Sequence, residues 1–456
     1  MEPRAAIVFG AGTSGRAAAR ALLRRGAEVA VAVREPDDAT DALAAEGAAI
    51  LAGDPAASVA GWGPRHAGAT AVFSPGIPPS APEFAAARAA GLRVRGELCL
   101  GCELFGGRVV AITGSKGKSS VAKLLADALS ASGIPAAPCG NYGTPVCEIA
   151  DLRPAPAVAV AECSSFQLET ADEALAPEAA AVLNLSRDHL NRHGTMEAYL
   201  DAKLRIFDHL APGGLALVPA PADDPGGVLA RAAAQHPGLR FATFGAAPDA
   251  EWRWVPGAVL APGGERLAVA GSYFDNDVLG PAAACAAAIL LRLGLAPEAA
   301  AAAIRGFEPL PHRMQRVAEG RGAVWIDNSK ATSLAAMLAS VRMAPKPALL
   351  VAGGRIKEDL SVRGGELAAL GVAKAYTIGE CGEAMARAWG GALPVEFAGD
   401  LGRACEAAAR DVGALRPACV LLAPGTASFD QFRSFEERGD RFAALARRLA
   451  GGPATA

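Results

Sequence analysis

The hydrophobic positions of the chain fall into short apolar runs that alternate with stretches of helical spacing. Residues 109–112 form such a run, and the apolar positions of residues 121–129 then recur at intervals of three and four before Gly133. The first pattern is typical of a buried parallel strand, and the second of a helix that ends at a glycine. The same order of strand, glycine-rich turn and helix begins at residues 6–9. The pattern therefore predicts an α/β protein.

The turn after residues 109–112 carries the strongest candidate chemistry. Glycine lets backbone N–H groups point at an anion, Lys118 can reach the outer phosphates of a nucleotide, and the Ser119 hydroxyl can ligate Mg²⁺. The strict Walker pattern has a glycine where this chain has Ile112, so an ordinary glycine-rich turn is the alternative. The flanking strand and helix favour a nucleoside-triphosphate site, formed by Gly114, Ser115, Lys116, Gly117, Lys118, Ser119 and Ser120.

Three segments, each with its own strands and turns, divide the 456 residues. They predict a Rossmann-like N-terminal domain at 1–95, a central P-loop ATPase-type α/β domain at 96–309 and a C-terminal Rossmann-like α/β domain at 310–456. Residues 219–264 are rich in Ala, Pro and Gly. We expect loops and short strands there.

Composition excludes several classes of protein. A net charge of −3 gives no basic field for nucleic acid, and no apolar run reaches membrane-spanning length. Nine cysteines are scattered, and the only close pair, Cys99 and Cys102, has no adjoining histidine. We therefore expect buried thiols rather than a zinc or redox site, and a cytoplasmic protein without membrane insertion.

Two further features lie at the ends of predicted strands. Residues 10–15 form a G-x-G-x-x-G turn that could bind NAD, bind another nucleotide's phosphates, or only pack helix against strand. In the central segment Glu162 ends the strand at 158–161, and residues 184–193 follow the strand at 180–183. Because ligands bind at the carboxyl ends of parallel strands, Glu162 and residues 184–193 are predicted to face the phosphate turn.

Several motifs in one order resemble the Mur ligase family over nearly the whole length. They are T-G-S-K-G-K-S-S at 113–120, E-C-S-S-F-Q-L at 162–168, N-L-S-R-D-H-L-N-R-H at 184–193, A-K-L-R-I-F at 202–207 and L-P-H-R at 310–313. Residues 328–332, 353–357 and 427–436 resemble the D-glutamate branch of that family. The resemblance implies that the three domains bind UDP, ATP and the amino acid, in that order.

The resemblance implies an ATP- and Mg²⁺-dependent ligase of peptidoglycan synthesis, which adds D-glutamate to UDP-N-acetylmuramoyl-L-alanine through an acyl phosphate. The implied catalytic residues are Lys118, Glu162, His189 and Lys203. Ser119, Glu162, His189 and Lys203 would be the metal ligands, with Lys203 as an N-carbamate; an ordinary ion-paired lysine is the alternative. The implied ATP contacts are residues 114–120 with Asn141, Arg313, Asn328 and Lys330.

The implied substrate contacts lie toward the two ends of the chain. Gly12, Thr13, Ser14 and Gly15 would hold the UDP diphosphate. D-glutamate would be surrounded by Thr332, Lys357, Ser428 and Phe435, with Lys357 and the hydroxyls meeting its carboxylates. We expect a monomer with small-molecule partners, and domain closure about hinges near Arg95 and Pro309.

The chain departs from the family pattern on the nucleotide side. Where the family has G-x-H-N-x-x-N, a gapless placement puts Asn276, Asp277 and Gly280 on the motif positions. Asn191 stands for a usual aspartate, and Asn328 for a usual ribose-binding acid. A Mur-type ligase for another amino acid such as L-glutamate, a non-catalytic nucleotide-binding paralogue and an NAD oxidoreductase therefore remain alternatives.

Overall fold

Three separate β-sheets, of five, nine and six strands, organise the chain, as the α/β prediction requires. The computed structural model describes residues 3–356 and 360–451. The first two sheets belong to one unit, which extends to Phe307 without residues 276–278, and the third sheet belongs to a second unit. None of the helices in these described ranges is long and apolar enough to cross a membrane.

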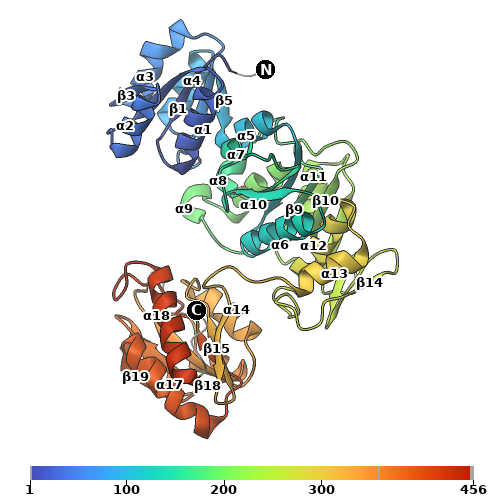
Figure 1. The fold of residues 1–456 in the computed structure, drawn as a ribbon, viewed down its shortest axis with the longest axis vertical. Coiled ribbons are helices and arrows are strands. Elements are labelled where there is room, and N and C mark those ends of the chain that lie inside the picture. Colours follow the sequence, from blue (N-terminus) through green and yellow to red (C-terminus); the bar gives the residue numbers. More distant parts are fainter. Residues whose placement is uncertain (1–2, 357–359, 452–456) are drawn as a thin grey trace. The chain divides into compact units, whose positions relative to one another are not determined.

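The first sheet is wholly parallel, in the order β3-β2-β1-β4-β5 (Figure 1). Its central strands β1, β2 and β4 are mostly apolar because helices cover both faces. Val8 and Val31 face α1 and α2, whereas Ile7 and Phe73 face α3 and α4. The elements are β1 (Ala5–Phe9), α1 (Thr13–Leu23), β2 (Glu28–Val33), α2 (Asp38–Ala45), β3 (Ala49–Ala52), α3 (Pro55–Trp62), the 3₁₀ helix η1 (Gly63–Arg65), β4 (Thr70–Phe73), α4 (Pro82–Ala89) and β5 (Arg93–Gly96).

The first sheet is fastened to the residues that follow it. Leu100 and Cys147 of the central segment lie in the same hydrophobic cluster as α1. Arg95 is 1% exposed and forms ion pairs with Asp172, at 2.6 Å, and with Glu103. Opening a hinge near Arg95 would break these ion pairs, so the hinge predicted there stays a prediction.

The second sheet has the order β14-β13-β12-β11-β10-β9-β6-β8-β7. Its parallel core places β6 between β8 and β9, so three strand ends lie side by side. The elements are α5 (Glu97–Phe105), β6 (Arg108–Thr113), α6 (Lys118–Ala131), β7 (Ala136–Gly140), α7 (Val146–Ile149), β8 (Val158–Glu162), α8 (Ser165–Leu168), β9 (Ala179–Val182), α9 (Leu190–His193), α10 (Met196–Leu204), η2 (Arg205–Phe207), β10 (Leu215–Pro219), η3 (Pro221–Asp223), α11 (Val228–Gln235), β11 (Phe241–Gly245), β12 (Trp252–Val255), β13 (Ala258–Leu260), β14 (Arg266–Ala268), α12 (Gly280–Arg292) and α13 (Pro297–Arg305).

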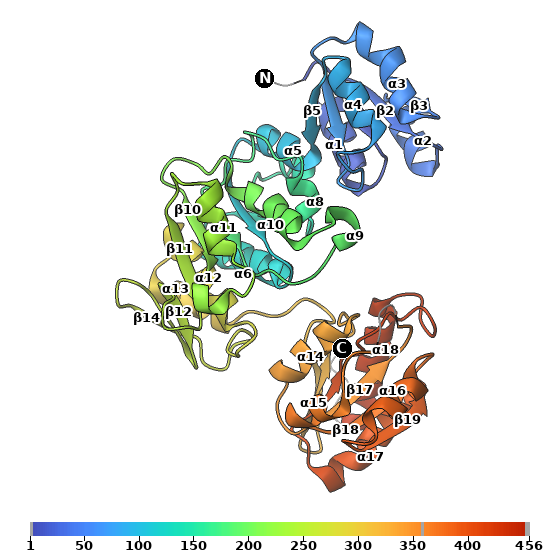
Figure 2. The same cartoon turned by 180° about the vertical axis from the view of Figure 1, so that it is seen from behind.

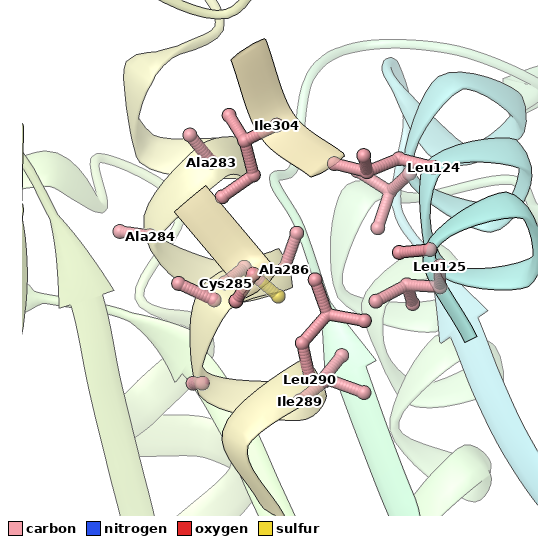
Figure 3. Packing of buried hydrophobic residues seen from close by; sticks show 14 of the residues in the cluster. Leu124, Leu125, Ala283, Ala284, Cys285, Ala286, Ile289, Leu290 and Ile304 are labelled. Carbon is pink, nitrogen blue, oxygen red and sulfur yellow. The ribbon is translucent and has the colours of Figure 1, made fainter. Parts of the chain in front are cut away.

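Most residues of helix α12 are small, and its C-terminal turn carries Ile289, Leu290 and Leu291. Its Ala283, Ala286 and Cys285 are fully buried, and Leu290 packs toward Leu125 of α6 (Figure 3). Alanine has the highest helix propensity and lets neighbouring backbones approach closely. The same propensity explains α11, an eight-residue helix inside residues 219–264, where only loops and short strands were expected.

The third sheet has the order β15-β16-β20-β17-β18-β19, and only β15 is antiparallel (Figure 2). Helices α17 and α18 cover one face, and α14, α15 and α16 the other. The elements are β15 (Gln315–Gly320), β16 (Ala323–Asp327), α14 (Leu334–Met343), β17 (Ala348–Gly353), α15 (Gly364–Ala369), β18 (Val372–Ile378), α16 (Gly382–Trp389), β19 (Val395–Gly399), α17 (Leu401–Leu415), β20 (Cys419–Leu422) and α18 (Phe435–Ala450).

Candidate functional site

The phosphate turn connects β6 to α6 through two glycines in the left-handed half of backbone space. Gly114 has φ +144° and Gly117 has φ +84°. A Cβ on Gly114 would lie 3.0 Å from the Leu183 Cβ, so both the conformation and the space require glycine there. Helix α6 begins at Lys118 after Gly117, which provides no side-chain cap, and a helix N-terminus of this kind suits an anion.

Residues after β9 fasten this turn, as predicted from the order of the strands. The Ser115 N–H donates to the Asn184 carbonyl at 3.0 Å, and the Lys116 N–H donates to the Asn184 side-chain oxygen at 2.9 Å. The Ser115 hydroxyl accepts the Ser186 N–H at 2.9 Å and lies 3.3 Å from the Tyr199 hydroxyl. The turn is therefore preorganised by the chain itself.

Two lysines converge on one carbonyl of the turn. The Lys118 ammonium donates to the Gly114 carbonyl at 2.9 Å, and the Lys203 ammonium donates to the same oxygen at 3.0 Å. Lys203 is 1% exposed. Burial, and secondarily the charge of Lys118, lowers the pKa of Lys203 to about 7. A neutral amine is the form that can take up carbon dioxide, so the site allows a carbamate on Lys203.

Glu162 at the end of β8 supplies a buried carboxylate. Its Oε1 accepts the Asn141 side-chain N–H at 2.7 Å, and its buried Oε2 has no hydrogen-bond partner among the described residues. Oxygen is the ligand that Mg²⁺ prefers, so the unpartnered oxygen fits a metal ion. Within the same described ranges, no group of three or more His, Cys, Asp or Glu side chains could hold a metal. An ion here would therefore also need other oxygens, such as the Ser119 hydroxyl and phosphates.

The rest of the E-C-S-S-F-Q-L motif has a structural explanation. Ser164 caps α8 by accepting the Gln167 N–H at 3.2 Å, and the Gln167 side chain accepts the Ser164 N–H at 2.9 Å. This reciprocal capping box fixes the turn that follows Glu162.

His189 lies next to Phe166 of this motif. Its backbone has φ +53°, its side chain is 48% exposed, and its ring meets the edge of Phe166 at 5.0 Å between centroids. The neighbouring Asp188 carboxylate accepts from the Lys116 ammonium at 3.4 Å. The imidazole is therefore accessible from solvent beside the phosphate turn.

The first glycine turn borders a cavity of about 420 Å³. Helix α1 begins at Thr13 after Gly12, with Ser14 and Gly15 in its first turn. The cavity is lined by the end of β1, by Arg34 and by Gly76 and Ile77 of the turn after β4. Arg34 and the 76–78 turn were not predicted as site residues, because neither carries a recognisable phosphate pattern.

In the second unit several predicted residues come together around Phe435. The Lys330 ammonium lies 3.8 Å from the centroid of the Phe435 ring. Burial, followed by the charge of Arg313, lowers the pKa of Lys330. The Ser329 hydroxyl donates to the Phe435 carbonyl at 2.7 Å. Arg313, Lys330 and Phe435 therefore form one cluster.

The other predicted residues of this unit differ in their surroundings. Asn328 uses both ends of its amide locally, since it accepts the Met314 N–H at 3.2 Å and donates to the Ser340 hydroxyl at 2.6 Å. Ser428 is buried and Thr332 is half-buried in the loops after β20 and β16. Lys357 lies outside the described residues.

Arg438 was missed by the sequence analysis. It is fully buried on α18, where its Nε donates to the Ser329 hydroxyl at 2.9 Å and its Nη2 to the carbonyls of Ser329, at 3.0 Å, and Thr426, at 3.2 Å. It thereby fixes the loops that carry Lys330 and Ser428. The only available signal was its place two residues after the motif at 427–436.

All nine cysteines are free and buried. Cys99 and Cys102 on α5 are buried thiols, as expected, and burial raises the pKa of both. These thiols are packing groups rather than nucleophiles.

Comparisons with known proteins agree with the motifs. Residues 112–273 match the family model described as Mur ligase middle domain. A UDP-N-acetylmuramoylalanine–D-glutamate ligase of Myxococcus xanthus is 38% identical over 460 residues, covering 97% of this chain and 98% of that protein. One of Rubrobacter xylanophilus is 40% identical over 469 residues, covering 98% of each. The crystal structure of MurF from Acinetobacter baumannii shares the fold, with a TM-score of 0.58, 17% identity and coverage of 97% and 93%.

Proposed function

We infer that this chain, which belongs to the UDP-N-acetylmuramoylalanine–D-glutamate ligase branch of the Mur ligase family, is an ATP-dependent ligase that joins D-glutamate to UDP-N-acetylmuramoyl-L-alanine. The observation that carries the inference is this relationship over nearly the full length, together with the preorganised phosphate turn beside Glu162. Membership of a ligase family removes the NAD-oxidoreductase alternative for residues 10–15.

The first half-reaction activates the acceptor. A carboxylate is a poor electrophile, so its oxygen attacks the γ-phosphorus of ATP, the bond to the bridging oxygen of ADP breaks, and an acyl phosphate results. We assign the phosphate contacts to residues 114–120, with Lys118 moving from the Gly114 carbonyl to the outer phosphates. Asn141 would orient both Glu162 and the nucleotide. Mg²⁺ held by Ser119 and Glu162 would neutralise phosphate charge.

We assign Ser119, Glu162, His189 and a carbamate of Lys203 as the metal-binding groups. The unpartnered Oε2 of Glu162 and the lowered pKa of Lys203 support this assignment. A carbamate would turn a buried cation into an anion, which suits a divalent ion better than an ammonium does.

The second half-reaction forms the amide. The D-glutamate nitrogen attacks the acyl carbon, gives up a proton, and phosphate leaves. We propose that Thr332, Lys357, Ser428 and Phe435 bind this amino acid, whose two carboxylates need cations and hydroxyls. Arg313, Lys330 and Asn328 would contact ATP, although the amide of Asn328 would first have to leave Met314 and Ser340.

Each sheet would bind one substrate. We propose the UDP site at Gly12, Thr13, Ser14 and Gly15 beside the 420 Å³ cavity, within residues 1–95. The phosphates of ATP would bind within residues 96–309, and the amino acid within 310–456, which also supplies Arg313, Asn328 and Lys330 to ATP. The nine reduced, buried thiols suit the cytoplasm. The proposed partners are these small molecules, with the chain acting as a monomer.

A ligation assay over a panel of amino acids tests the function. The purified chain with ATP, Mg²⁺ and UDP-N-acetylmuramoyl-L-alanine should release phosphate and form an amide with D-glutamate, and not with L-glutamate. K118A should abolish ligation, whereas K123A on the same helix, where Lys123 pairs with Asp127 at 2.6 Å, should retain it. Amide formation with another amino acid would favour a ligase of different specificity. Phosphate release that needs no amino acid, or no reaction at all, would contradict the proposal.

A further inference from the structure

One motif residue of the loop at 184–193, Arg192, has no assigned role, yet its guanidinium binds two segments far apart in the sequence. It lies on α9, three residues after His189. Its side chain is 12% exposed, so most of it is covered by neighbouring residues. Its bonds extend to two different sheets of the first unit.

On one side Arg192 binds the turn that follows β4 of the first sheet. Its Nη1 donates to the Gly76 carbonyl at 3.0 Å, and its Nη2 lies 3.3 Å from the carbonyls of Pro75 and of Ile77. Three consecutive carbonyls thus face one guanidinium. The same turn lines the 420 Å³ cavity beside the first glycine turn, through Gly76 and Ile77.

On the other side Arg192 binds the segment after β8. Its Nη2 donates to the Glu169 carboxylate at 2.5 Å, and its guanidinium carbon lies 4.4 Å from the Phe166 ring centroid. The edge of Phe166 in turn contacts the His189 ring. The guanidinium therefore connects the turn that lines the cavity to Phe166 and, through that ring, to His189.

We propose that Arg192 is a positioning residue that sets the register, meaning the relative position, of the sugar-nucleotide site of the first sheet and the phosphate-transfer site of the second. This rests on the proposed function. Its charge is balanced by Glu169 and its N–H groups bind the carbonyls of residues 75–77, so its contacts hold these two segments together. It holds the 75–77 turn where the acceptor's carboxyl group, at the far end of the sugar nucleotide, arrives in line with the γ-phosphate.

Register matters because phosphoryl transfer depends on near-contact alignment. A displacement of about 1 Å at the reacting atoms can cost about 100-fold in rate. A lysine in place of Arg192 would keep the charge but offer a single compact ammonium, which cannot span three carbonyls and a carboxylate at once.

The chain offers a matched control in Arg205. It is also an arginine of the first unit that donates to two carbonyls, those of Glu169 and, at 2.6 Å, Ala171. Among the contacts the structure gives it, none reaches residues 75–77. R205K therefore tests the loss of an arginine that binds backbone carbonyls, without loss of the contact to residues 75–77.

The experiment compares R192K and R205K in the full-length chain. We expect R192K to lower kcat by about 10- to 100-fold and to raise the KM for UDP-N-acetylmuramoyl-L-alanine, with the KM for ATP unchanged. R205K should leave all three within about threefold. Equal effects of the two variants, or an effect of R192K confined to the KM for ATP, would overturn the proposal.

A second variant covers a failure of R192K to fold. E169Q keeps the shape of the carboxylate partner and removes its charge, so it loosens the clamp while leaving Arg192 in place. It should show the same pattern at smaller size, and unchanged kinetics would count against the register role. Absence of ligation by the unmodified chain would instead refute the proposed function.

Discussion

Two glycines of the first turn should respond in opposite ways to the same substitution. A Cβ on Gly15 would lie 1.9 Å from the Gly10 carbonyl oxygen, whereas a Cβ on Gly12 would meet nothing within 4 Å. Gly12 also has φ −67°, which alanine adopts readily. G15A must therefore push β1 and α1 apart, and G12A need not.

The cost of G15A can be bounded from the clash. Overpacking a tight site costs about 1–3 kcal/mol. Since 1.4 kcal/mol is a factor of 10, amide exchange in β1 and β2 should become about 5- to 150-fold faster. For G12A we expect less than about 1 kcal/mol, because only a helix N-cap changes from Gly to Ala.

Hydrogen exchange measured by mass spectrometry on peptides from residues 5–33 resolves the first sheet from the rest. UDP binding to each folded variant then separates space from recognition. G12A, although nearly as stable as the parent, should bind UDP less well if the turn holds the diphosphate. Exchange as slow in G15A as in G12A would refute the clash argument, and unchanged UDP affinity in G12A would refute the diphosphate contact.

Three further predictions concern ionisable groups. E162Q should lower kcat by at least about 100-fold without loss of thermal stability, since it removes a charge that metal binding needs, keeps an oxygen for Asn141 and alters only the unpartnered Oε2 position. An unimpaired phosphate-release rate would contradict this. Burial raises the pKa of Glu97 from 4.5 to about 7, so between these pH values the folded chain keeps a proton that the unfolded chain releases. The free energy of unfolding should therefore fall by about 3 kcal/mol from pH 4.5 to 7. Urea denaturation of E97Q should show no such fall in the unfolding midpoint. The hydrogen bond to Asp327 raises the pKa of His312, so the pair stabilises the fold below pH 6.5 and stabilises it less as pH rises through the raised pKa. H312N should therefore speed hydrogen exchange in peptides from residues 310–330 more at about pH 6 than at about pH 9, each relative to the parent chain at the same pH.

The sequence predicted elements whose pattern is local and missed those that depend on neighbours. The strand that leads into Gly114 and the helix after it follow from an apolar run and a glycine turn. Strand β15 carries charged and polar residues on an edge, so no apolar run marks it. Residues 315–320 form a strand because they pair with β16, and the sequence of either segment alone does not predict this pairing.

The candidate site shows the same division. Lys118 was predicted from the glycine-spaced turn, and Glu162 from its place at the carboxyl end of a parallel strand, which lies beside β6. Arg192 and Arg438 bind carbonyls of distant loops, and any exposed carbonyl can accept from an arginine. Which carbonyl lies within reach is set by the packing of whole elements, so no spacing in the sequence could have given these partners.

Because every thiol is buried, the rate at which each cysteine is alkylated reports on local opening of the structure. Burial raises the pKa of all nine cysteines, so a thiol-directed electrophile meets a reactive thiolate only when the surrounding structure opens. Alkylation at Cys285 would time the opening of α12, and alkylation at Cys405 that of α17. Cysteine-directed covalent inhibitors would therefore find no accessible thiol on the native enzyme. The lysines around the phosphate turn are the alternative target for a covalent inhibitor of this enzyme.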